Sequence, residues 1–212
     1  MKQYDDLFKE YEQLTARADA AFQNMEKDYA ACVKCAEQCA DCCSAVFGLF
    51  LIESAYLNLQ INALGEESKR AIMARADEAD EALLAMEKRL QEHSGDSNKL
   101  ADAIGKERVR CPLLGDDRKC RLYSVRPITC RVYGIPAMTN GKVHACFKAG
   151  FEKGRSYPVF NLDGMYKELY RLSAKFLERA GVSDTERAAL LLSVSKSIKT
   201  PLEDLLQIDN GR

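Results

Sequence analysis

The chain contains 212 residues, 47% hydrophobic and 30% charged, which is the composition of a soluble globular protein with room for a core. Its formal net charge of −1 excludes a global field that would recruit nucleic acid or an anionic membrane. The first residues, MKQYDDLFKEYEQL, lack the apolar core of a signal peptide, and the longest apolar run, AVFGLFLI, is too short to span a bilayer. We therefore expect a cytoplasmic protein with a single domain over residues 1–212 and with no nucleic-acid or membrane partner.

The first predicted element is a long N-terminal helix. Apolar residues repeat along it at heptad spacing, in the series Tyr4, Leu7, Tyr11, Leu14, Ala18, Ala21 and Met25. The same count continues onto the first cysteines, with Asp28 as the one misfit, and no Gly or Pro interrupts residues 2–46. The pattern therefore predicts that the helix runs on through residue 42.

The most unusual segment is CVKCAEQCADCC, residues 32–43, which holds five of the nine cysteines: Cys32, Cys35, Cys39, Cys42 and Cys43. On a helix, at ~100° per residue, all five thiols would lie within an arc of about 100°. A core has no reason to choose cysteine five times, and thiols on one helix face are poorly placed for disulfides. Soft metal centres bind several thiolates at once, and cytosolic thiols stay reduced. The segment therefore predicts a metal site, with a buried cysteine stripe as the weaker alternative.

Residues 44–64 are apolar enough to predict a central core helix, which Gly65 ends. Residues 66–92 repeat the heptad pattern among charged residues and predict a long helix packed antiparallel on its neighbours. The acidic run at residues 77–81 fits a solvated face better than a cation site. The loop EHSGDSN, residues 92–98, is expected to expose His93.

The other four cysteines lie between residues 106 and 150, at Cys111, Cys120, Cys130 and Cys146. Their spacings suit no single helix face, and prolines and glycines between them predict a loop-rich wrap. Residues 106–131 also carry eight Lys and Arg against three Asp and Glu, and such cations depress thiol pKa values and offset thiolate charge. A nucleic-acid patch is the competing interpretation, but it lacks stacking aromatics beyond Tyr123 and Tyr133.

The C-terminal part is predicted to be helical again. One helix face carries Met165, Leu169, Leu172 and Phe176 and ends near Gly181. Ser183 and Glu186 form a capping box that predicts a helix through residue 198, and residues 200–203 start a last short one. No stretch alternates like a strand over a useful length. The fold class expected is mainly α, a helical bundle with a loop-rich, cysteine-containing metal-binding wrap that faces the cysteine helix.

Two motifs together resemble a known family. The first is Cys39-x-x-Cys42-Cys43, and the second is the series Cys111-Pro112-Leu113-Leu114, Cys120-Arg121-Leu122-Tyr123, Arg126-Pro127, Cys130-Arg131 and Cys146. This combination resembles the YkgJ-type cysteine-cluster family, named for its CxxCxxCC motif and thought to chelate zinc or iron. The resemblance covers residues 32–150 and departs from the family at Ala36, where the motif has a cysteine.

The resemblance implies metal binding by Cys39, Cys42, Cys43, Cys111, Cys120, Cys130 and Cys146, with Cys32 or Cys35 as an eighth ligand. Eight ligands allow two Cys₄ sites or one larger cluster. Arg126 and Arg131 are expected beside the bound group, as counter-charges or as donors to sulfur.

The sequence favours an iron–sulfur cluster over zinc by a small margin. A zinc ribbon usually places its CxxC on a tight turn, whereas the first motif is expected to be helical. Cys111-Pro112 is similar to the Cys-Pro of ferredoxin motifs. Residues 35–42 also spell the CxxxCxxC of radical SAM enzymes, but the alternating strands and helices of that fold are missing from the sequence.

Three classes of function remain open. The first is a metal-binding protein for electron transfer, metal handling or docking of a protein partner. The second is an enzyme whose cluster assists chemistry on an unknown substrate, although no catalytic set can be named and His144 is the one candidate for proton transfer or mixed ligation. The third is a helical scaffold with a purely structural zinc.

Overall fold

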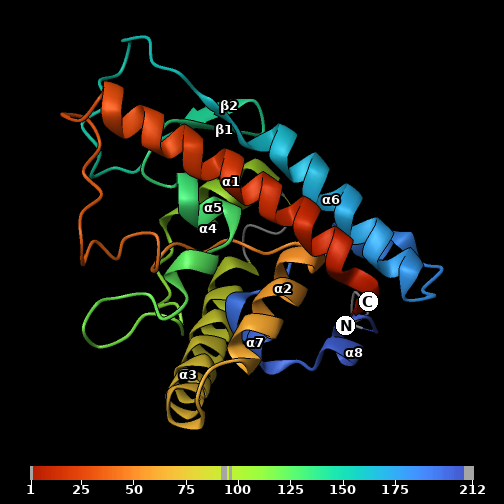
Figure 1. Ribbon diagram of the computed structural model, residues 1–212. Helices are drawn as coiled ribbons and strands as arrows, with labels where there is room; N and C mark the ends of the chain where they lie inside the picture. The colour runs from red at the N-terminus through yellow and green to blue at the C-terminus, as the bar shows by residue number, and fades with distance from the viewer. Residues whose placement is uncertain (1, 92–94, 96, 208–212) are drawn as a thin grey trace.

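The structure is a computed structural model that describes residues 2–91, 95 and 97–207. Figure 1 shows α1 and α6 side by side along one side of the molecule, with α2, α3 and α7 grouped beyond them. The helices are α1 (Asp5–Asp28), α2 (Leu51–Asn62), α3 (Glu66–Leu90), α4 (Ser97–Lys106), α5 (Ile128–Val132), α6 (Leu162–Arg179), α7 (Val194–Lys199) and α8 (Leu202–Leu205). The 3₁₀ helices are η1 (Lys2–Tyr4), η3 (Tyr123–Val125) and η4 (Thr185–Ala189). The expected class, mainly α, is confirmed.

The larger hydrophobic core lies where α1, α2, α5 and α6 meet. The residues at the predicted heptad positions of the N-terminal helix pack into this core. Buried among them are Tyr4, Leu7, Tyr11, Leu14, Ala18 and Met25, and Ala21 is partly buried. The predicted face of α6 is buried as well, with Phe176 between Tyr4 and Phe8 in ring contact. Periodicity therefore predicted these two helices correctly, because both bury a continuous apolar stripe.

A second, smaller core joins α2, α3 and α7 to the segment that follows α4. Its buried residues include Leu57, Ile72 and Ile198 from the helices and Leu113 and Leu122 from that segment. Cys111 and Cys120 pack against this core as partly buried neighbours. The wrap is therefore tied to the helices by apolar contacts beside two of the predicted ligands.

The predicted continuation of the N-terminal helix through residue 42 is wrong, because α1 ends at Asp28. No glycine or proline stops it. Cysteine is a weak helix former, and five cysteines in twelve residues leave the segment little local preference for a helix. Its backbone groups pair with distant parts of the chain instead. The N–H of Gly150 donates to the carbonyl of Cys32, and the N–H of Cys111 donates to the carbonyl of Cys43, each at 2.7 Å.

The central core helix is shorter than predicted and begins only at Leu51. Just before it, Leu49 and Leu192 form an isolated antiparallel bridge with N–H to carbonyl distances of 2.8 and 2.9 Å. The same bridge divides the helix predicted over residues 183–198 into η4 and α7. Asp184, rather than Ser183, caps η4 by accepting from the N–H of Glu186, and Ser193 caps α7.

Three short strands were not predicted from the sequence. They are β1 (Ala137–Thr139), β2 (Lys142–His144) and β3 (Phe160–Asn161), in the order β2-β1-β3. β1 pairs antiparallel with β2 and parallel with β3. At two or three residues each, they are too short for an alternating pattern to show in the sequence.

The remaining helices follow the predictions in part. α3 matches the predicted heptad helix and α8 the predicted last short helix, whereas α4 was not predicted. His93 lies outside the described residues.

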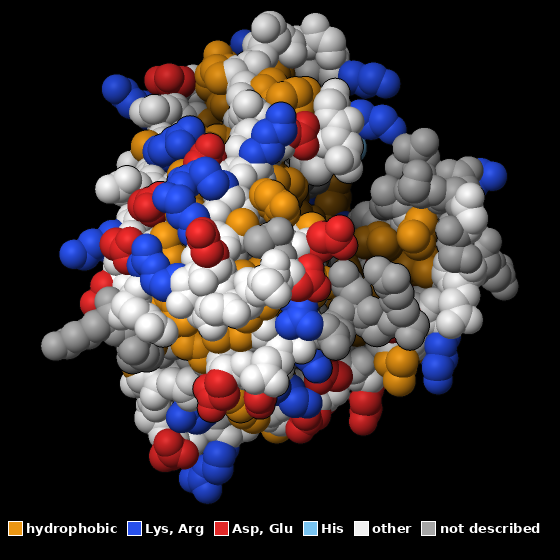
Figure 2. Space-filling model, turned by 90° about the vertical axis from the view of Figure 1, so that its right-hand side faces the viewer, with side chains coloured by type: hydrophobic (Ala, Val, Ile, Leu, Met, Phe, Trp, Pro, Cys, Tyr) orange, Lys and Arg blue, Asp and Glu red, His pale blue; other side chains and the backbone are white. Residues whose placement is uncertain are grey.

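Within the part of the chain that the structure describes, no helix is both long and apolar enough to cross a membrane. Figure 2 shows a face on which both signs of charge are interspersed and hydrophobic side chains line a hollow.

Candidate metal centre

The cysteine segment, residues 29–50, is built from successive turns. The N–H of Cys39 donates to the carbonyl of Ala36, and the N–H of Cys43 donates to the carbonyl of Ala40, at 3.0 and 3.1 Å. Gln38 has a φ of +67°, a left-handed conformation that few non-glycine residues adopt. Because these residues form separate turns, the five thiols do not share one helix face as the sequence predicted.

The loop-rich wrap lies directly against this segment. Ala45 and Arg108 form an antiparallel bridge, and the N–H of Val109 donates to the carbonyl of Ser44 at 3.0 Å. With the Cys111–Cys43 hydrogen bond, these contacts form a short two-stranded ladder. Cys43 and Cys111 therefore lie together although 67 residues separate them in sequence.

A tight loop between residues 111 and 120 returns the chain to the same place. Leu114 and Cys120 form an antiparallel bridge, and the N–H of Arg121 donates to the carbonyl of Leu113 at 2.8 Å. The tip of this loop reaches the cysteine segment, where Lys119 forms an ion pair with Glu37. The loop therefore brings Cys120 back beside Cys111.

Cys130 is supplied by the short helix α5. Pro127 precedes this helix, and the N–H of Ile128 donates to Oε1 of the buried Glu53 at 3.0 Å. The same carboxylate accepts from the N–H of Phe50 at 3.2 Å and so caps α2 as well. Glu53 thus fixes α5, and with it Cys130, against the start of α2.

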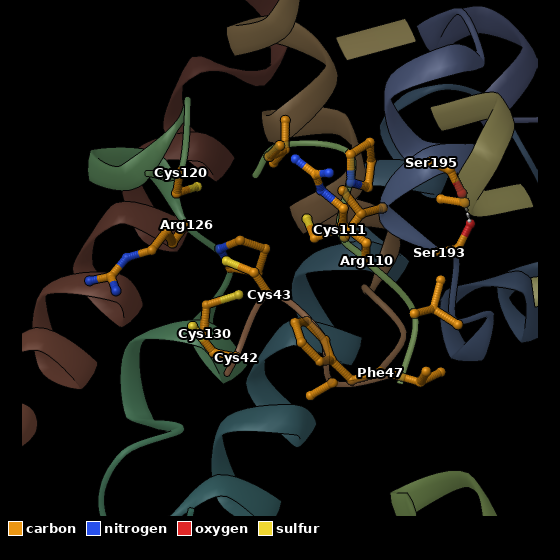
Figure 3. A pocket seen from close by; sticks show the side chains of 18 of the residues that line it. Cys42, Cys43, Phe47, Arg110, Cys111, Cys120, Arg126, Cys130, Ser193 and Ser195 are labelled. Carbon is orange, nitrogen blue, oxygen red and sulfur yellow. Dashed lines mark hydrogen bonds between the residues drawn. The ribbon is translucent and has the colours of Figure 1, made fainter. Parts of the chain in front are cut away.

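Five thiols line one pocket: those of Cys42, Cys43, Cys111, Cys120 and Cys130. Figure 3 shows Cys42, Cys43, Cys120 and Cys130 on one side, Ser193 and Ser195 on the opposite side, and Cys111 between the two groups. The guanidinium of Arg126 is directed away from the other labelled side chains. The pocket encloses ≈ 60 Å³, several times the roughly 10–15 Å³ that one water molecule needs. Phe47, Leu83 and Val194 contribute to an apolar wall.

The pKa values of these thiols reflect their mutual proximity. The side chain of Cys130 keeps some contact with solvent through the pocket, yet protein atoms surround its thiol and burial raises its pKa well above the usual value. Burial is the main cause that raises the pKa of Cys111 to about 12, and the charges of nearby Cys120 and Cys42 contribute to the same rise. Without a cation the group therefore stays largely protonated.

Cys42 is the exception among the five. The pKa of Cys42 is lowered to about 7, mainly by a hydrogen bond from the Cys43 thiol; burial opposes this shift and the charge of Arg126 supports it. The same hydrogen bond raises the pKa of Cys43. A pair that shares one proton in this way supplies a first thiolate for a metal at neutral pH.

The other predicted ligands lie outside this pocket. The side chain of Cys35 is exposed, whereas those of Cys32, Cys39 and Cys146 are partly buried. The thiol of Cys146 donates to Oδ2 of Asp41 at 3.5 Å, and Asp41 itself is buried. Sequence analysis missed Asp41; its position between Cys39 and Cys42 was the available signal.

The two predicted arginines have different surroundings. Arg126 lines the thiol pocket, stacks at 3.6 Å over the ring of Tyr123 and lowers the pKa values of Cys42 and Cys120. Arg131 is buried, forms an ion pair with Asp19 and donates to the carbonyl of Ser124 at 2.7 Å.

His144 is exposed at the end of β2.

The donor set fits a soft metal in its chemistry. All nine cysteines are free, five line one pocket, and Arg126 supplies positive charge beside them, as a polythiolate centre requires. Across residues 2–91, 95 and 97–207, no three His, Cys, Asp or Glu side chains are already converged as a preformed ligand set. The thiols are therefore gathered in one place, and the turns that carry them would have to close on an ion.

The fold and the site together define the class: a mainly helical protein in which thiols from distant segments line one pocket. Residues 34–147, more than half of the chain, match the model of a family described as CxxCxxCC, "Putative zinc- or iron-chelating domain". The chain therefore belongs to the CxxCxxCC family, as its motifs predicted. Neither the curated proteins nor the solved structures contain a match to this chain.

Proposed function

We propose that the protein holds zinc or iron, the latter as an ion or an iron–sulfur cluster, through the thiolates of the pocket. The observation that carries this proposal is the convergence of Cys42, Cys43, Cys111, Cys120 and Cys130 from three separate segments. When bound, the metal supplies a Lewis acid or, as a cluster, an electron carrier. The chain's own residues hold the thiolates together, and Arg126 offsets their negative charge.

The choice between zinc and an iron–sulfur cluster is more even than the sequence suggested. The argument against zinc relied on a helical first motif, and residues 32–43 are turns instead. Tight turns that carry cysteines suit zinc as well as a cluster. Cys111-Pro112 and the nearby Arg126 remain as support for the cluster, which we keep as the favoured option.

The family match also bears on the eighth ligand. It begins at residue 34 and so includes Cys35 but not Cys32. The pKa of Cys35 is raised to about 11, mainly by burial. The charges of nearby Cys39 and Cys146 contribute to the same rise. We infer that Cys35 rather than Cys32 completes the ligand set.

Serine variants of single cysteines test this proposal. Anaerobic purification from the cytosol, where we place the protein, keeps the thiols reduced, and elemental analysis then counts metal per chain. We expect Cys111→Ser, Cys120→Ser and Cys130→Ser to lose metal, because each removes a thiolate from the pocket. Cys32→Ser is the matched control and keeps the full load.

The colour of the same samples separates the metals. A brown protein with iron and acid-labile sulfide carries a cluster, whereas a colourless protein with zinc does not. Reversible bleaching by a reductant would support electron transfer over metal handling or partner docking. If the wild-type chain binds no metal, or if all three pocket variants keep the full load, the proposal is wrong.

A further inference from the structure

Two exposed aromatic side chains of the wrap each carry a cation on the face of the ring. Among the described residues, Phe147 and Tyr123 are the most exposed large hydrophobic side chains, at 71% and 63%. The guanidinium of Arg126 lies 3.6 Å from the ring centroid of Tyr123, and the ammonium of Lys148 lies 5.6 Å from that of Phe147. Exposed aromatic rings beside cations, arginine above all, are typical of a surface that binds a partner.

Both aromatic–cation pairs lie beside the cysteine segment. Arg126 lines the thiol pocket together with Cys42. The ammonium of Lys148 lies 3.2 Å from the carboxylate of Asp41, which directly precedes Cys42 in the chain. The two pairs come from different parts of the wrap, but they meet the same short stretch of the cysteine segment.

Two further arginines of the wrap reach this segment. Arg118 donates to the carbonyl of Gln38 at 3.3 Å, and Arg108 forms the antiparallel bridge with Ala45. Both side chains are exposed, and their printed hydrogen bonds go to backbone carbonyls. Within the part of the chain that the structure describes, neither they nor Arg126 forms an ion pair with a carboxylate. Figure 3 shows the guanidinium of Arg126 directed away from the other labelled side chains, so three positive charges are available to a partner.

We propose that an acidic segment of a partner protein docks on this surface, beside the thiol pocket. The docking face consists of Arg108, Arg118, Tyr123, Arg126, Phe147 and Lys148. The two rings pack against apolar side chains of the partner, and the guanidinium groups pair with its carboxylates. The inference rests on the proposed function for the reason that a partner comes to this pocket, but the contact itself needs no metal.

Acidic side chains around Arg118 favour a protein partner over a nucleic acid. Glu37, Asp116 and Asp117 are exposed there, each in an ion pair with a neighbouring cation. A nucleic acid carries a negative charge at every phosphate, and this continuous backbone would meet the three carboxylates. The acidic side chains of a protein can be spaced to avoid them. Separate charges around a few aromatic anchors are also the usual composition of a protein interface.

Fluorescence anisotropy with two labelled probes tests the proposal on the full-length, reduced protein as purified. One probe is a peptide of glutamate residues interrupted by single leucines, and the other is an oligothymidylate of the same net charge. We expect the peptide to bind more tightly than the oligothymidylate, and its affinity to fall as salt is added. Tighter binding of the oligothymidylate would overturn the proposal in favour of a nucleic-acid surface, and no binding of the peptide would overturn it as well.

Variants then locate the contact. Arg118→Gln and Phe147→Ser should each weaken peptide binding by at least about threefold, because each removes one exposed group of the docking face and leaves every cysteine in place. The matched controls are Lys9→Gln on α1 and Tyr170→Ser on α6, which remove an exposed cation and an exposed aromatic ring elsewhere. Both controls should bind the peptide as the wild-type chain does. Equal affinity in the two docking-face variants and the wild-type chain, or equal weakening by the controls, would overturn the docking face.

Metal content, measured on the same samples, separates this inference from the proposed function. A wild-type chain that carries metal but does not bind the peptide would overturn the docking face alone. A wild-type chain that binds the peptide through these residues but never carries metal would overturn the proposed function alone.

Discussion

Arg126 and Arg131 are five residues apart, and their contacts assign them different tasks. The guanidinium of Arg126 donates to the carbonyl of Tyr123 at 2.9 Å, and its charge acts on the thiols of the pocket. Arg131 donates to the carbonyls of Ser124 and Arg126 at 2.7 Å and pairs with Asp19 of α1. Arg131 thus holds the loop from which Arg126 projects.

Separate variants should therefore show separate effects. Arg126→Glu places negative charge beside the thiolates, so we expect weaker metal retention and little change in the free energy of unfolding of the metal-free protein. Arg131→Met removes a buried pair whose partner is partly exposed, and we expect a loss of about 2 kcal/mol. Urea denaturation and competition with a metal chelator measure the two quantities. Equal metal affinity in Arg126→Glu and the wild-type chain would remove Arg126 from the site.

At the scale of elements, Glu53 joins α2 to α5 by accepting from the N–H of Phe50, just before α2, and from the N–H of Ile128, the first residue of α5. Burial raises the pKa of this carboxyl from 4.5 to about 7, and the two N–H donors and Arg131 oppose that rise only in part. The folded chain therefore binds the proton more tightly than the unfolded chain does. Between pH 4.5 and 7, this group makes the folded state less stable as the pH rises.

Glu53→Gln should isolate that dependence, because glutamine resembles the protonated acid and does not titrate. We expect the stability of the wild-type chain, measured against Glu53→Gln by urea denaturation, to fall by a few kcal/mol from about pH 4.5 to about pH 7. Taking the difference cancels the titration of the cysteines, which both proteins share. A difference that stays constant across this range would show that Glu53 remains charged in the folded chain.

The elements also show how far the sequence could predict this fold. The sequence predicted α1, α3 and α6 as helices, because each of them buries one apolar face whose residues recur at helical spacing. The conformation of the cysteine segment was predicted wrongly. Its cysteines continue the heptad spacing of the preceding helix, but spacing alone does not make a segment helical. Pairing between Leu49 and Leu192, or between Cys43 and Cys111, joins residues far apart in sequence and leaves no local signal.

The site was predictable in its residue types but not in its arrangement. Motif spacing selected the candidate cysteines, and their role as ligands stays a prediction; which of them line the pocket depends on turns such as that at Gln38. Asp41 and Glu53 were missed because a single acidic residue in a sequence does not show whether it will be buried. Their roles become visible only through partners such as Cys146 and Ile128.

At the scale of the whole molecule, the thiol pocket lies between the cysteine segment and the wrap. Backbone hydrogen bonds join the cysteine segment to the wrap at three points, through the N–H groups of Val109, Cys111 and Gly150. Leu113 and Leu122 are buried in the second core, but much of the segment from 106 to 150 is exposed or only partly buried. Such contacts offset only part of the entropy lost when some forty residues are ordered.

Metal binding would add to the stability of that segment, because ligands drawn from both sides tie the wrap to the residues after α1. We expect hydrogen exchange of residues 106–150 to accelerate by at least about tenfold when metal is removed, which corresponds to about 1.4 kcal/mol of local stability. The exchange of α1 and α6 should change little, since their core contains no thiol. Cys32→Ser, loaded and stripped in parallel, is the matched control and should behave as the wild-type chain does. Equal protection of residues 106–150 with and without metal would mean that the wrap is held by Leu113, Leu122 and its hydrogen bonds alone.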